Sequence, residues 1–283
     1  MRSLAAAWAG LMLLTAPAAA APGYGASAWV EDLKAARWEF AVGVAGATAL
    51  GVANWDWGGS ASFRAVPEGW FGTGTHWGGA DKLGHALSAY AMTNVVAERL
   101  LRSGRAPERA ALSGALTAQA FLLYIELLDG FSGEQGFARE DIVMNLLGSG
   151  LAYARTVHPR LRELMDFRMA YQPSGYEGFQ PFTDYAGQKY LLAWKLAGVA
   201  PLRDTPLRFA ELQLGYYTRG FSDAEQDAGL SPTRHGFVGI GLNLSELLWG
   251  RRSGPESGWR SAGRLFLEHL QLPYTAAQSS RTL

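Results

Sequence analysis

The feature that most constrains this chain is a set of polar residues in the otherwise apolar stretch 78–154. Each polar group stands at the edge or in the first turn of a segment that otherwise has the composition of a buried helix. Burying a polar group without a partner costs roughly 2–7 kcal/mol, and burying an ion costs more. A chain tolerates such groups only where they satisfy one another, bind a ligand or reach water. The stretch therefore predicts helices around a polar site, whose members are Asp81, Lys82, His85, Glu126, Asp129, Asp141 and Asn145.

Three helices are expected in this stretch, over residues 81–102, 107–128 and 139–155. A further helix is expected over 27–55, where small residues recur every four positions and let another helix approach closely. The uncharged run 110–125 is shorter than the roughly 20 residues that a membrane span needs. We therefore expect core helices, with embedding of these helices in a membrane as the alternative.

The composition changes after Tyr171, where an aromatic segment rich in glycine and proline begins. Helices are expected over 159–168 and 185–196, and strands over 207–217 and 237–244. In the second strand, apolar residues alternate with glycine and asparagine, which is the period-two pattern of a half-buried strand. Two strands joined by a polar connection predict one antiparallel hairpin, which is too small for a membrane barrel. The predicted fold class is therefore mainly α, a helical bundle followed by a C-terminal region with a small antiparallel β-hairpin.

The first residues have the anatomy of a secretory signal peptide, with Arg2, an apolar run and small residues that end at Ala20 and Ala21. We therefore expect export to the periplasm or an envelope membrane of a Gram-negative bacterium. The sequence has 0 Cys, so we expect neither disulfides nor a lipid-modified cysteine. The expected division is a signal peptide over 1–21, the helical bundle with its polar site over 22–170, the C-terminal region over 171–274 and a tail over 275–283.

The charge balance limits the classes of partner. Lys and Arg total 25, Asp and Glu total 25, and the formal net charge of +0 argues against nucleic acid. The sequence contains no nucleophile elbow, phosphate loop or dinucleotide fingerprint. The segment 60–79 combines tryptophans with glycines, which is typical of interfaces with proteins or lipid head groups. A membrane or another envelope protein is thus the expected partner, and the oligomeric state stays open.

Helical spacing places several of the polar residues in pairs. Asp81 and His85 are four residues apart and share a helix face. Asp81 alone could be an N-cap, whereas His85 lies one turn inside its helix among apolar neighbours. Asp141 and Asn145 are also four residues apart at a helix start, so they can face the same site.

Glu126 and Asp129 stand at the C-terminal end of an apolar helix. Carboxylates at that end oppose the helix dipole, which costs a few tenths of a kcal/mol or more. A sequence that keeps them there predicts that they have a partner.

Three interpretations of the polar site remain open. In the first, Lys82, His85, Glu126, Asp129 and Asn145 form a structural network, since buried polar groups usually serve one another. In the second, the site holds a divalent metal ion, with the candidate ligands His85, Glu126, Asp129 and Asp141. In the third, the site performs acid–base catalysis without a metal, and His85 is oriented by Asp81 or Glu126.

The order of these motifs resembles the YfiM-like family of predicted periplasmic lipoproteins, a bacterial domain of unknown function. The segments that carry the resemblance are Gly79–Ala–Asp81–Lys82–Leu–Gly84–His85, Tyr90, Glu126–x–x–Asp129–Gly130, Gly136–Phe137 and Asp141–x–x–x–Asn145–x–x–Gly148. A weaker likeness to VanZ-like membrane proteins rests on the Asp–Lys–x–x–His segment, the later glutamate and the Asp–x–x–x–Asn–x–x–Gly helix. That likeness implies helices around a polar site in or near a membrane, and neither family implies an established reaction.

Two functions are compatible with these features. The first is that of an envelope protein that associates with a membrane or an envelope partner and carries a polar site between helices. The second is that of a hydrolase or transferase, metal-dependent or not, that acts on a lipid or lipid-linked envelope substrate. In the enzyme, His85 is base or ligand, and Glu126 and Asp141 are ligands or acid–base partners. Asp129 orients these groups and Asn145 donates to the substrate, while Asp81 and Lys82 belong to the surrounding network.

Overall fold

The computed structural model describes residues 24–176, 178–251 and 256–283, so the expected signal peptide over 1–21 lies outside the described residues. The chain divides into two compact units. The first unit comprises Met1–Glu68 and Ser88–His158, and the second comprises Gly69–Leu87 and Pro159–Leu283. Helix α4, Ala80–Arg102, begins in the second unit and continues in the first.

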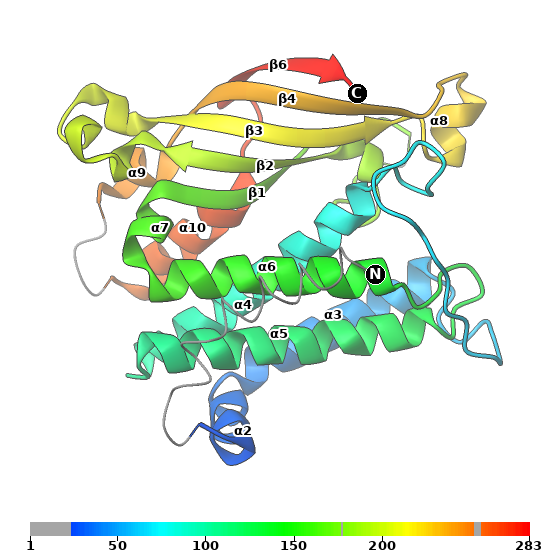
Figure 1. The fold of residues 1–283 in the computed structure, drawn as a ribbon, viewed down its shortest axis with the longest axis horizontal. Helices are drawn as coiled ribbons and strands as arrows, with labels where there is room; N and C mark the ends of the chain where they lie inside the picture. Colours follow the sequence, from blue (N-terminus) through cyan, green and yellow to red (C-terminus); the bar gives the residue numbers. More distant parts are fainter. Residues whose placement is uncertain (1–23, 177, 252–255) are drawn as a thin grey trace, which may run out of the picture. The chain divides into compact units, whose positions relative to one another are not determined.

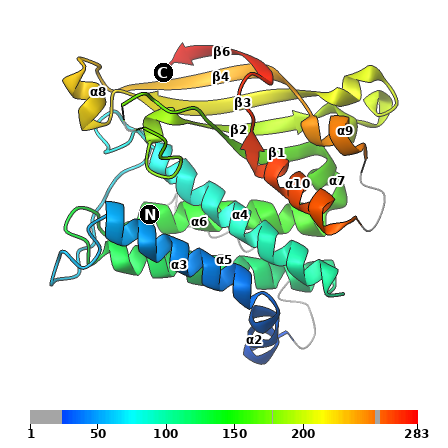
Figure 2. The ribbon, with the colours of Figure 1, turned by 180° about the vertical axis from the view of Figure 1, so that it is seen from behind.

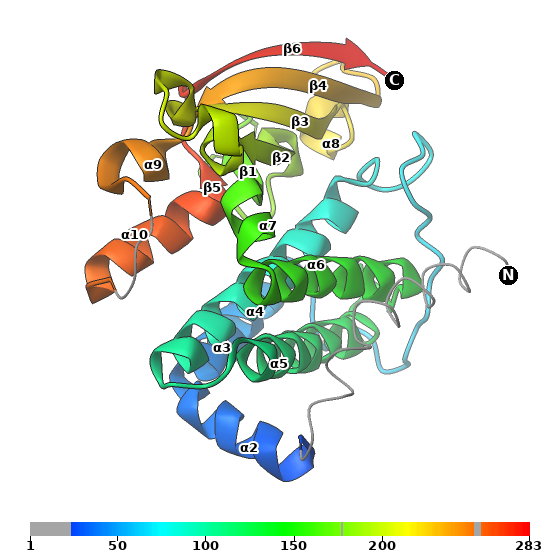
Figure 3. The same cartoon turned by 60° about the vertical axis from the view of Figure 1, so that its left-hand side comes forward.

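The first unit is built from long helices (Figure 3). They are α2 (Ala26–Ala35), α3 (Arg37–Asn54), the larger part of α4, α5 (Pro107–Asp129) and α6 (Arg139–Val157). The helices expected over 81–102, 107–128 and 139–155 are confirmed. The single helix expected over 27–55 is instead interrupted at Ala36, where φ is −105° and ψ is 20°. Neither glycine nor proline marks this break, so the hydrophobic pattern could not reveal it.

Small residues allow the helices of the first unit to approach closely. A Cβ added to Gly43 would lie 2.9 Å from the Met92 side chain, and one added to Gly114 would lie 2.7 Å from the backbone oxygen of Thr93. Helices α5 and α6 lie side by side (Figure 1). One cluster of the core consists of Ala47, Ala89, Leu122 and Ile125. The small-residue face predicted around Gly43 is therefore a packing surface between helices.

The second unit contains a six-stranded sheet in the order β5-β1-β2-β3-β4-β6 (Figure 1). Its strands are β1 (Met165–Tyr171), β2 (Gln188–Lys195), β3 (Ala210–Arg219), β4 (Thr233–Leu242), β5 (Leu270–Gln271) and β6 (Ala276–Thr282). Strand β5 pairs with β1 in parallel, and the other neighbours are antiparallel. Its helices are α7 (Pro159–Leu164), α8 (Asp223–Asp227), α9 (Leu244–Trp249) and α10 (Gly258–His269), with short 3₁₀ turns at Tyr185–Gly187, Leu196–Gly198, Ala200–Leu202 and Pro206–Phe209.

The sheet shows that the predicted fold class, mainly α with a small hairpin, is wrong. The predicted hairpin itself is present, because β3 and β4 pair as antiparallel neighbours. The helix expected over 185–196 is strand β2 after one 3₁₀ turn, and the end of the helix expected over 159–168 is strand β1. The expected tail over 275–283 contains strand β6.

Each of these strands lacks the alternation by which a strand is recognised. Apolar residues in β2 point to both faces, since Tyr190 and Leu191 are both buried, and a short run of this kind resembles a buried helix. Strand β6 is an edge strand, and nearly all of its side chains are exposed. Polar residues are common on sheet edges because they discourage further pairing. The polar sequence of β6 therefore predicts an irregular tail and not a strand.

The register gives the two faces of the sheet opposite character. On one face, Glu211 pairs with Gly241 and Gln213 with Gly239, so polar and glycine positions lie together. On the other face, Leu212 pairs with Ile240, and Leu214 lies opposite Val238. These apolar side chains are exposed, whereas Glu211 and Gln213 are buried. The alternation in β4 thus predicted a strand correctly but concealed that its apolar side faces outward.

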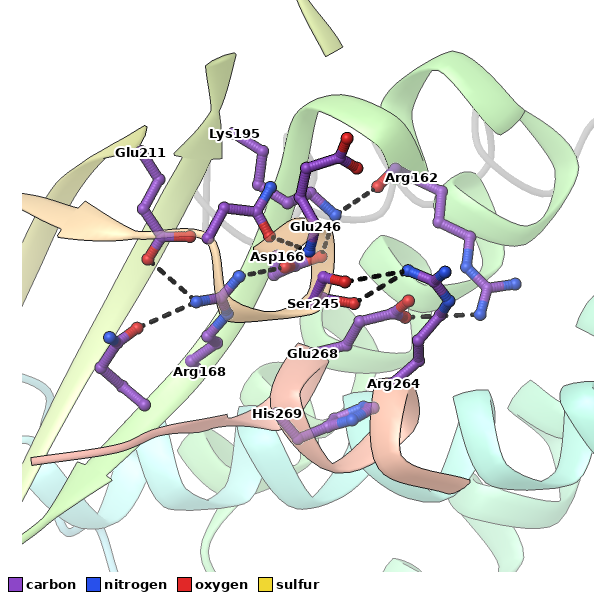
Figure 4. Close-up of polar contacts among 12 residues, drawn as sticks. Arg162, Asp166, Arg168, Lys195, Glu211, Ser245, Glu246, Arg264, Glu268 and His269 are labelled. Atoms are coloured by element: carbon purple, nitrogen blue, oxygen red, sulfur yellow. Dashed lines mark hydrogen bonds and ion pairs between the residues drawn. The ribbon is translucent and has the colours of Figure 1, made fainter. Parts of the chain in front are cut away.

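Helix α10 packs against β1, as Figure 2 shows. A network of buried charges lies beside it (Figure 4). Asp166 accepts hydrogen bonds from Arg168 at 2.5 Å and from Lys195 at 2.7 Å, and Arg168 also reaches Glu211 at 2.9 Å. At the helix itself, Glu268 pairs with Arg162 at 3.4 Å. The polar face of the sheet is therefore closed by ion pairs as well as by apolar contacts.

Candidate functional site

Two buried carboxylates meet in the first unit. Glu126 stands near the C-terminal end of α5, and Asp141 stands in the first turn of α6. Glu126 is 1% exposed and Asp141 is 4% exposed. A carboxylate oxygen of Glu126 lies within 4.8 Å of a carboxylate oxygen of Asp141. Two carboxylates at this distance repel each other unless a cation, a proton or hydrogen-bond donors lie nearby. This pair is therefore the natural centre of the predicted polar site.

The position of Glu126 has a structural explanation. Its Oε2 accepts a hydrogen bond from the backbone N–H of Ala138 at 3.3 Å, and Ala138 is the N-cap of α6. The first N–H groups of a helix have no partner within the helix and attract negative charge. The carboxylate thus sits at an unfavourable end of α5 because it serves the favourable end of α6. This interaction supplies the partner that the sequence predicted for Glu126.

A third carboxylate approaches Asp141 from a loop. Glu68 is half-buried and offers an oxygen within 4.8 Å of an oxygen of Asp141. Sequence reasoning missed Glu68, because a glutamate between proline and glycine in a loop has no helical spacing to relate it to Asp141. Asp141 therefore has acidic neighbours from both the loop and α5.

Asn145 lies one turn after Asp141 on α6 and is 1% exposed. Its backbone oxygen accepts from Gln119 Nε2 at 3.0 Å, and the same nitrogen reaches Ser149 Oγ at 2.8 Å. Neither Oδ1 nor Nδ2 of Asn145 has a hydrogen-bond partner among the described residues. A buried amide in that state costs about 1–3 kcal/mol, which makes it unusual in a structural position.

Asp129 has a different environment. Its Oδ1 accepts a hydrogen bond from the indole Nε1 of Trp57 at 2.6 Å. Among the described residues, two groups of acidic and histidine side chains have possible ligand atoms within 4.8 Å of one another, and Asp129 belongs to neither group. Its role as an orienting residue or metal ligand stays a prediction.

The remaining predicted residues stand at the start of α4 in the second unit. Asp81 lies in the first turn of the helix and pairs with Lys82, whose Nζ is 2.9 Å from Asp81 Oδ2. Lys82 is 1% exposed, and His85 is half-buried one turn after Asp81. That these three act in one site with the carboxylates of the first unit remains a prediction.

The donor set of the first unit suits a hard cation. Carboxylate and amide oxygens are the ligands that Mg²⁺, Ca²⁺ and Mn²⁺ prefer. Glu126 and Asp141 could each contribute an oxygen to one ion, with Glu68 beside Asp141 and Asn145 one helical turn away from it. The same residues could instead form a metal-free network with neighbouring hydrogen-bond donors.

One family model is similar to the segment that holds these residues. Residues 67–157 match the model of the family described as Predicted periplasmic lipoprotein (DUF2279). This match agrees with the resemblance inferred from the motifs and with the expected periplasmic or envelope location. All the predicted site residues, and Glu68, fall within the matched segment. No curated protein and no solved structure matches the chain.

Proposed function

We propose that this is a periplasmic envelope protein that binds a membrane surface through the apolar face of the sheet in its second unit. The observation that carries the proposal is a group of large apolar side chains that the sheet presents to solvent. We call this group the apolar sheet face, and it consists of Trp194, Leu212, Leu214, Val238, Ile240 and Leu242.

The register makes the apolar sheet face continuous across three strands. Trp194 lies opposite Leu212, which lies opposite Ile240, and the next row begins with Leu214 opposite Val238. Exposed apolar patches of this kind on a folded protein mark interaction sites. The face therefore needs a partner that removes it from water.

The chemistry of the face favours lipid over a protein. Protein interfaces carry about one hydrogen bond per 100–200 Å². Apart from the indole N–H of Trp194, the six side chains offer no polar group. An aromatic residue with one polar group is common where a protein meets the head groups of a bilayer.

The expected strength of binding follows from the exposure of these side chains. Ile240 is 63% exposed, Val238 59% and Leu214 50%. Burying a full side chain of this size is worth about 1.5–3 kcal/mol, so burying the exposed half is worth about 1 kcal/mol. Six such side chains provide about 6 kcal/mol before the cost of immobilising the protein.

The first unit offers further apolar surface. In α5, Leu116, Leu123 and Leu127 are exposed and fall on one face of the helix. Among the described residues, α5 is also the one helix that is long and apolar enough to cross a membrane, a property that core helices of soluble proteins share. Contact of this unit with lipid would reinforce the same function.

Flotation with phosphatidylethanolamine–phosphatidylglycerol vesicles tests the proposal. We expect the wild type to float with the vesicles, and a Leu214→Ser, Ile240→Ser variant to bind about 30-fold more weakly, because it loses about 2 kcal/mol. Leu248→Ser on α9 is the matched control, since Leu248 is 60% exposed but lies off the sheet. A wild type that stays in the lower fractions, or a double variant that floats equally well, contradicts the proposal.

A second function is favoured by the approach of Glu126 and of Glu68 to Asp141, and we propose it as the alternative. In this case the site binds a divalent cation and supports a hydrolase or transferase that acts on a lipid or lipid-linked envelope substrate. A bound divalent ion would activate water and stabilise negative charge on the substrate.

The sequence also predicts His85 as a member of that site. Ala89 of α4 packs with Leu122 and Ile125 of α5. Earlier along α5, Gly114 lies against Thr93, so the two helices are antiparallel. His85 lies one turn before Ala89 on α4, and His85→Ala tests whether it belongs to the site.

Metal analysis by mass spectrometry separates the enzyme from a structural network. We expect a stoichiometric divalent ion in the wild type and in the control Glu134→Gln, an exposed carboxylate, and its loss in Glu126→Gln, Asp141→Asn and His85→Ala. A chelator should lower the melting temperature of the wild type toward that of Glu126→Gln. A wild type without an ion and without a chelator effect contradicts the metal site.

A further inference from the structure

The second unit contains a cavity of about 450 Å³ on the polar side of its sheet. Its walls come from the end of β1, the segment after it, β2, α8 and the chain between β5 and β6. Cavities that bind small molecules usually measure about 300–1,000 Å³. The volume therefore suits a ligand of one or two small rings.

Two cations line this cavity. Lys189 Nζ and Arg219 Cζ each lie 4.8 Å from the centre of the Tyr217 ring, and the imidazole of His235 stacks on the same ring at 4.6 Å. Lys189 Nζ also lies 3.4 Å from Gln278 Oε1. No carboxylate of the described residues forms an ion pair with Lys189 or Arg219. The site thus holds two positive charges that no salt bridge compensates.

The pKa values agree with this geometry. Burial lowers the pKa of Lys189, and the charge of Arg219 lowers it further. Burial likewise lowers the pKa of Arg219, against the attraction of Glu225 and Asp184. The pKa of His235 is lowered by burial and by both cations. An anion between the cations would relieve their mutual repulsion.

A buried acceptor faces the same cavity. Glu225 is 1% exposed, and its Oε2 accepts from the backbone N–H groups of Phe221 and Ser222 at 3.1 and 3.3 Å. Its Oε1 has no hydrogen-bond partner among the described residues. Since Glu225 lines the cavity, a hydroxyl or amine of a ligand could satisfy this oxygen.

Aromatic rings complete the lining. Tyr171, Tyr176 and Tyr274 border the cavity. Tyr274 is 94% exposed and has a φ of 64°, a left-handed conformation that a non-glycine residue rarely adopts. Residues with such a conformation cluster at ligand sites.

We propose that this cavity binds a small hydroxylated anion, a sugar that carries a phosphate or a carboxylate. Lys189 and Arg219 bind the anionic group, and Glu225 Oε1 accepts a hydrogen bond from a hydroxyl. The tyrosines cover the apolar face of the ring. This site is independent of the apolar sheet face and of the carboxylates in the first unit.

Calorimetry with glucose 6-phosphate tests the site, with glucuronate as the carboxylate probe and glucose as the neutral one. We expect the first two to bind and glucose not to bind. Lys189→Met and Arg219→Gln should each weaken glucose 6-phosphate binding about tenfold or more, whereas Lys34→Met, an exposed lysine in the first unit, should leave it unchanged.

Two comparisons decide the nature of the ligand. Inorganic phosphate should bind more weakly than glucose 6-phosphate, since it lacks the hydroxyls and the ring. Failure of both charged sugars to bind, or equal binding of glucose, overturns the proposal. Equal binding of inorganic phosphate overturns the roles given to Glu225 and the tyrosines. Melting curves verify folding, and Arg219→Gln provides the test if Lys189→Met fails to fold.

Discussion

Replacement of Arg168 by methionine should destabilise the protein strongly, because this side chain compensates two buried acids. Arg168 is 3% exposed and donates to Asp166 at 2.5 Å, to Glu211 at 2.9 Å and to Gln271 at 2.9 Å. Methionine fills a similar volume without a charge. The variant therefore isolates the electrostatic part of the network shown in Figure 4.

Asp166 and Glu211 keep different hydrogen-bond partners in the Arg168→Met variant. Asp166 keeps its bond to Lys195 at 2.7 Å, whereas Glu211 keeps only the neutral amide of Gln213 at 2.9 Å. Removing one partner of a buried ion pair costs about 3–5 kcal/mol, because the other charge stays buried. One carboxylate that loses its hydrogen-bonded cation thus predicts a loss of about 3–5 kcal/mol in the free energy of unfolding. Arg168→Met, Glu211→Gln should be more stable than Arg168→Met alone.

The loss should depend on pH. Burial raises the pKa of Glu211, and the charge of Arg168 limits this rise. In the folded state the carboxyl therefore holds its proton to a higher pH than in the unfolded state, and the stability it contributes is lost as the pH rises through the folded pKa. Without Arg168 the folded pKa rises further. The gap in stability between wild type and Arg168→Met should therefore widen from pH 5 to pH 8.

Urea unfolding followed by circular dichroism measures these quantities. The reasoning is refuted if Arg168→Met loses less than about 1 kcal/mol at pH 8, or if the loss is greater at pH 5. It is also refuted if the Glu211→Gln change brings no recovery in the Arg168→Met background.

Two further predictions concern the first unit. Asp32 is fully buried, and burial alone would raise its pKa. Hydrogen bonds from Arg109, Arg105 and Ser113 nevertheless hold that pKa below the ordinary value. The stability that this charge contributes is present above the ordinary aspartate pKa and is lost as the pH falls through the pKa of Asp32 in the folded state. Asp32→Asn should therefore cost about 3 kcal/mol in the free energy of unfolding at pH 7, measured with urea. The variant should also lose less stability than the wild type as the pH is lowered. Gly114→Ala should destabilise the protein by about 1–3 kcal/mol, because the new Cβ would lie 2.7 Å from the Thr93 oxygen. At Gly46 a new Cβ would meet nothing within 4 Å, so Gly46→Ala should be neutral or stabilise α3 by up to about 1 kcal/mol. Thermal melts measure both effects. Equal effects of the two alanines would contradict the close packing of α4 on α5.

The sequence predicts the long helices because their signals are local. A proline marks the start of α5, and the apolar residues of α4 to α6 follow the helical period. The sheet depends on contacts between distant segments, such as β1 with β5 and β4 with β6. Strand β2 is buried on both faces and β6 is polar, so neither displays the alternation that marks a strand.

The candidate site was predictable to a similar extent. Glu126, Asp141 and Asn145 stand out because charged and amide groups are unusual in apolar helices. Glu68 approaches Asp141 through the path of a loop, which no periodicity encodes. The bond from Ala138 to Glu126, which explains why an acid ends α5, needs the fold of the connection between α5 and α6. The cations of the cavity meet only once β2 and β3 are paired.

The central claim, that the sheet presents an apolar face to lipid, can be measured at a single position. Because the sequence has 0 Cys, Ile240→Cys gives one site for an environment-sensitive fluorophore, and Leu248→Cys gives the matched control on α9. On addition of phosphatidylethanolamine–phosphatidylglycerol vesicles, the emission from position 240 should shift to shorter wavelength and the emission from position 248 should not. No shift at position 240, or an equal shift at both positions, would contradict the account.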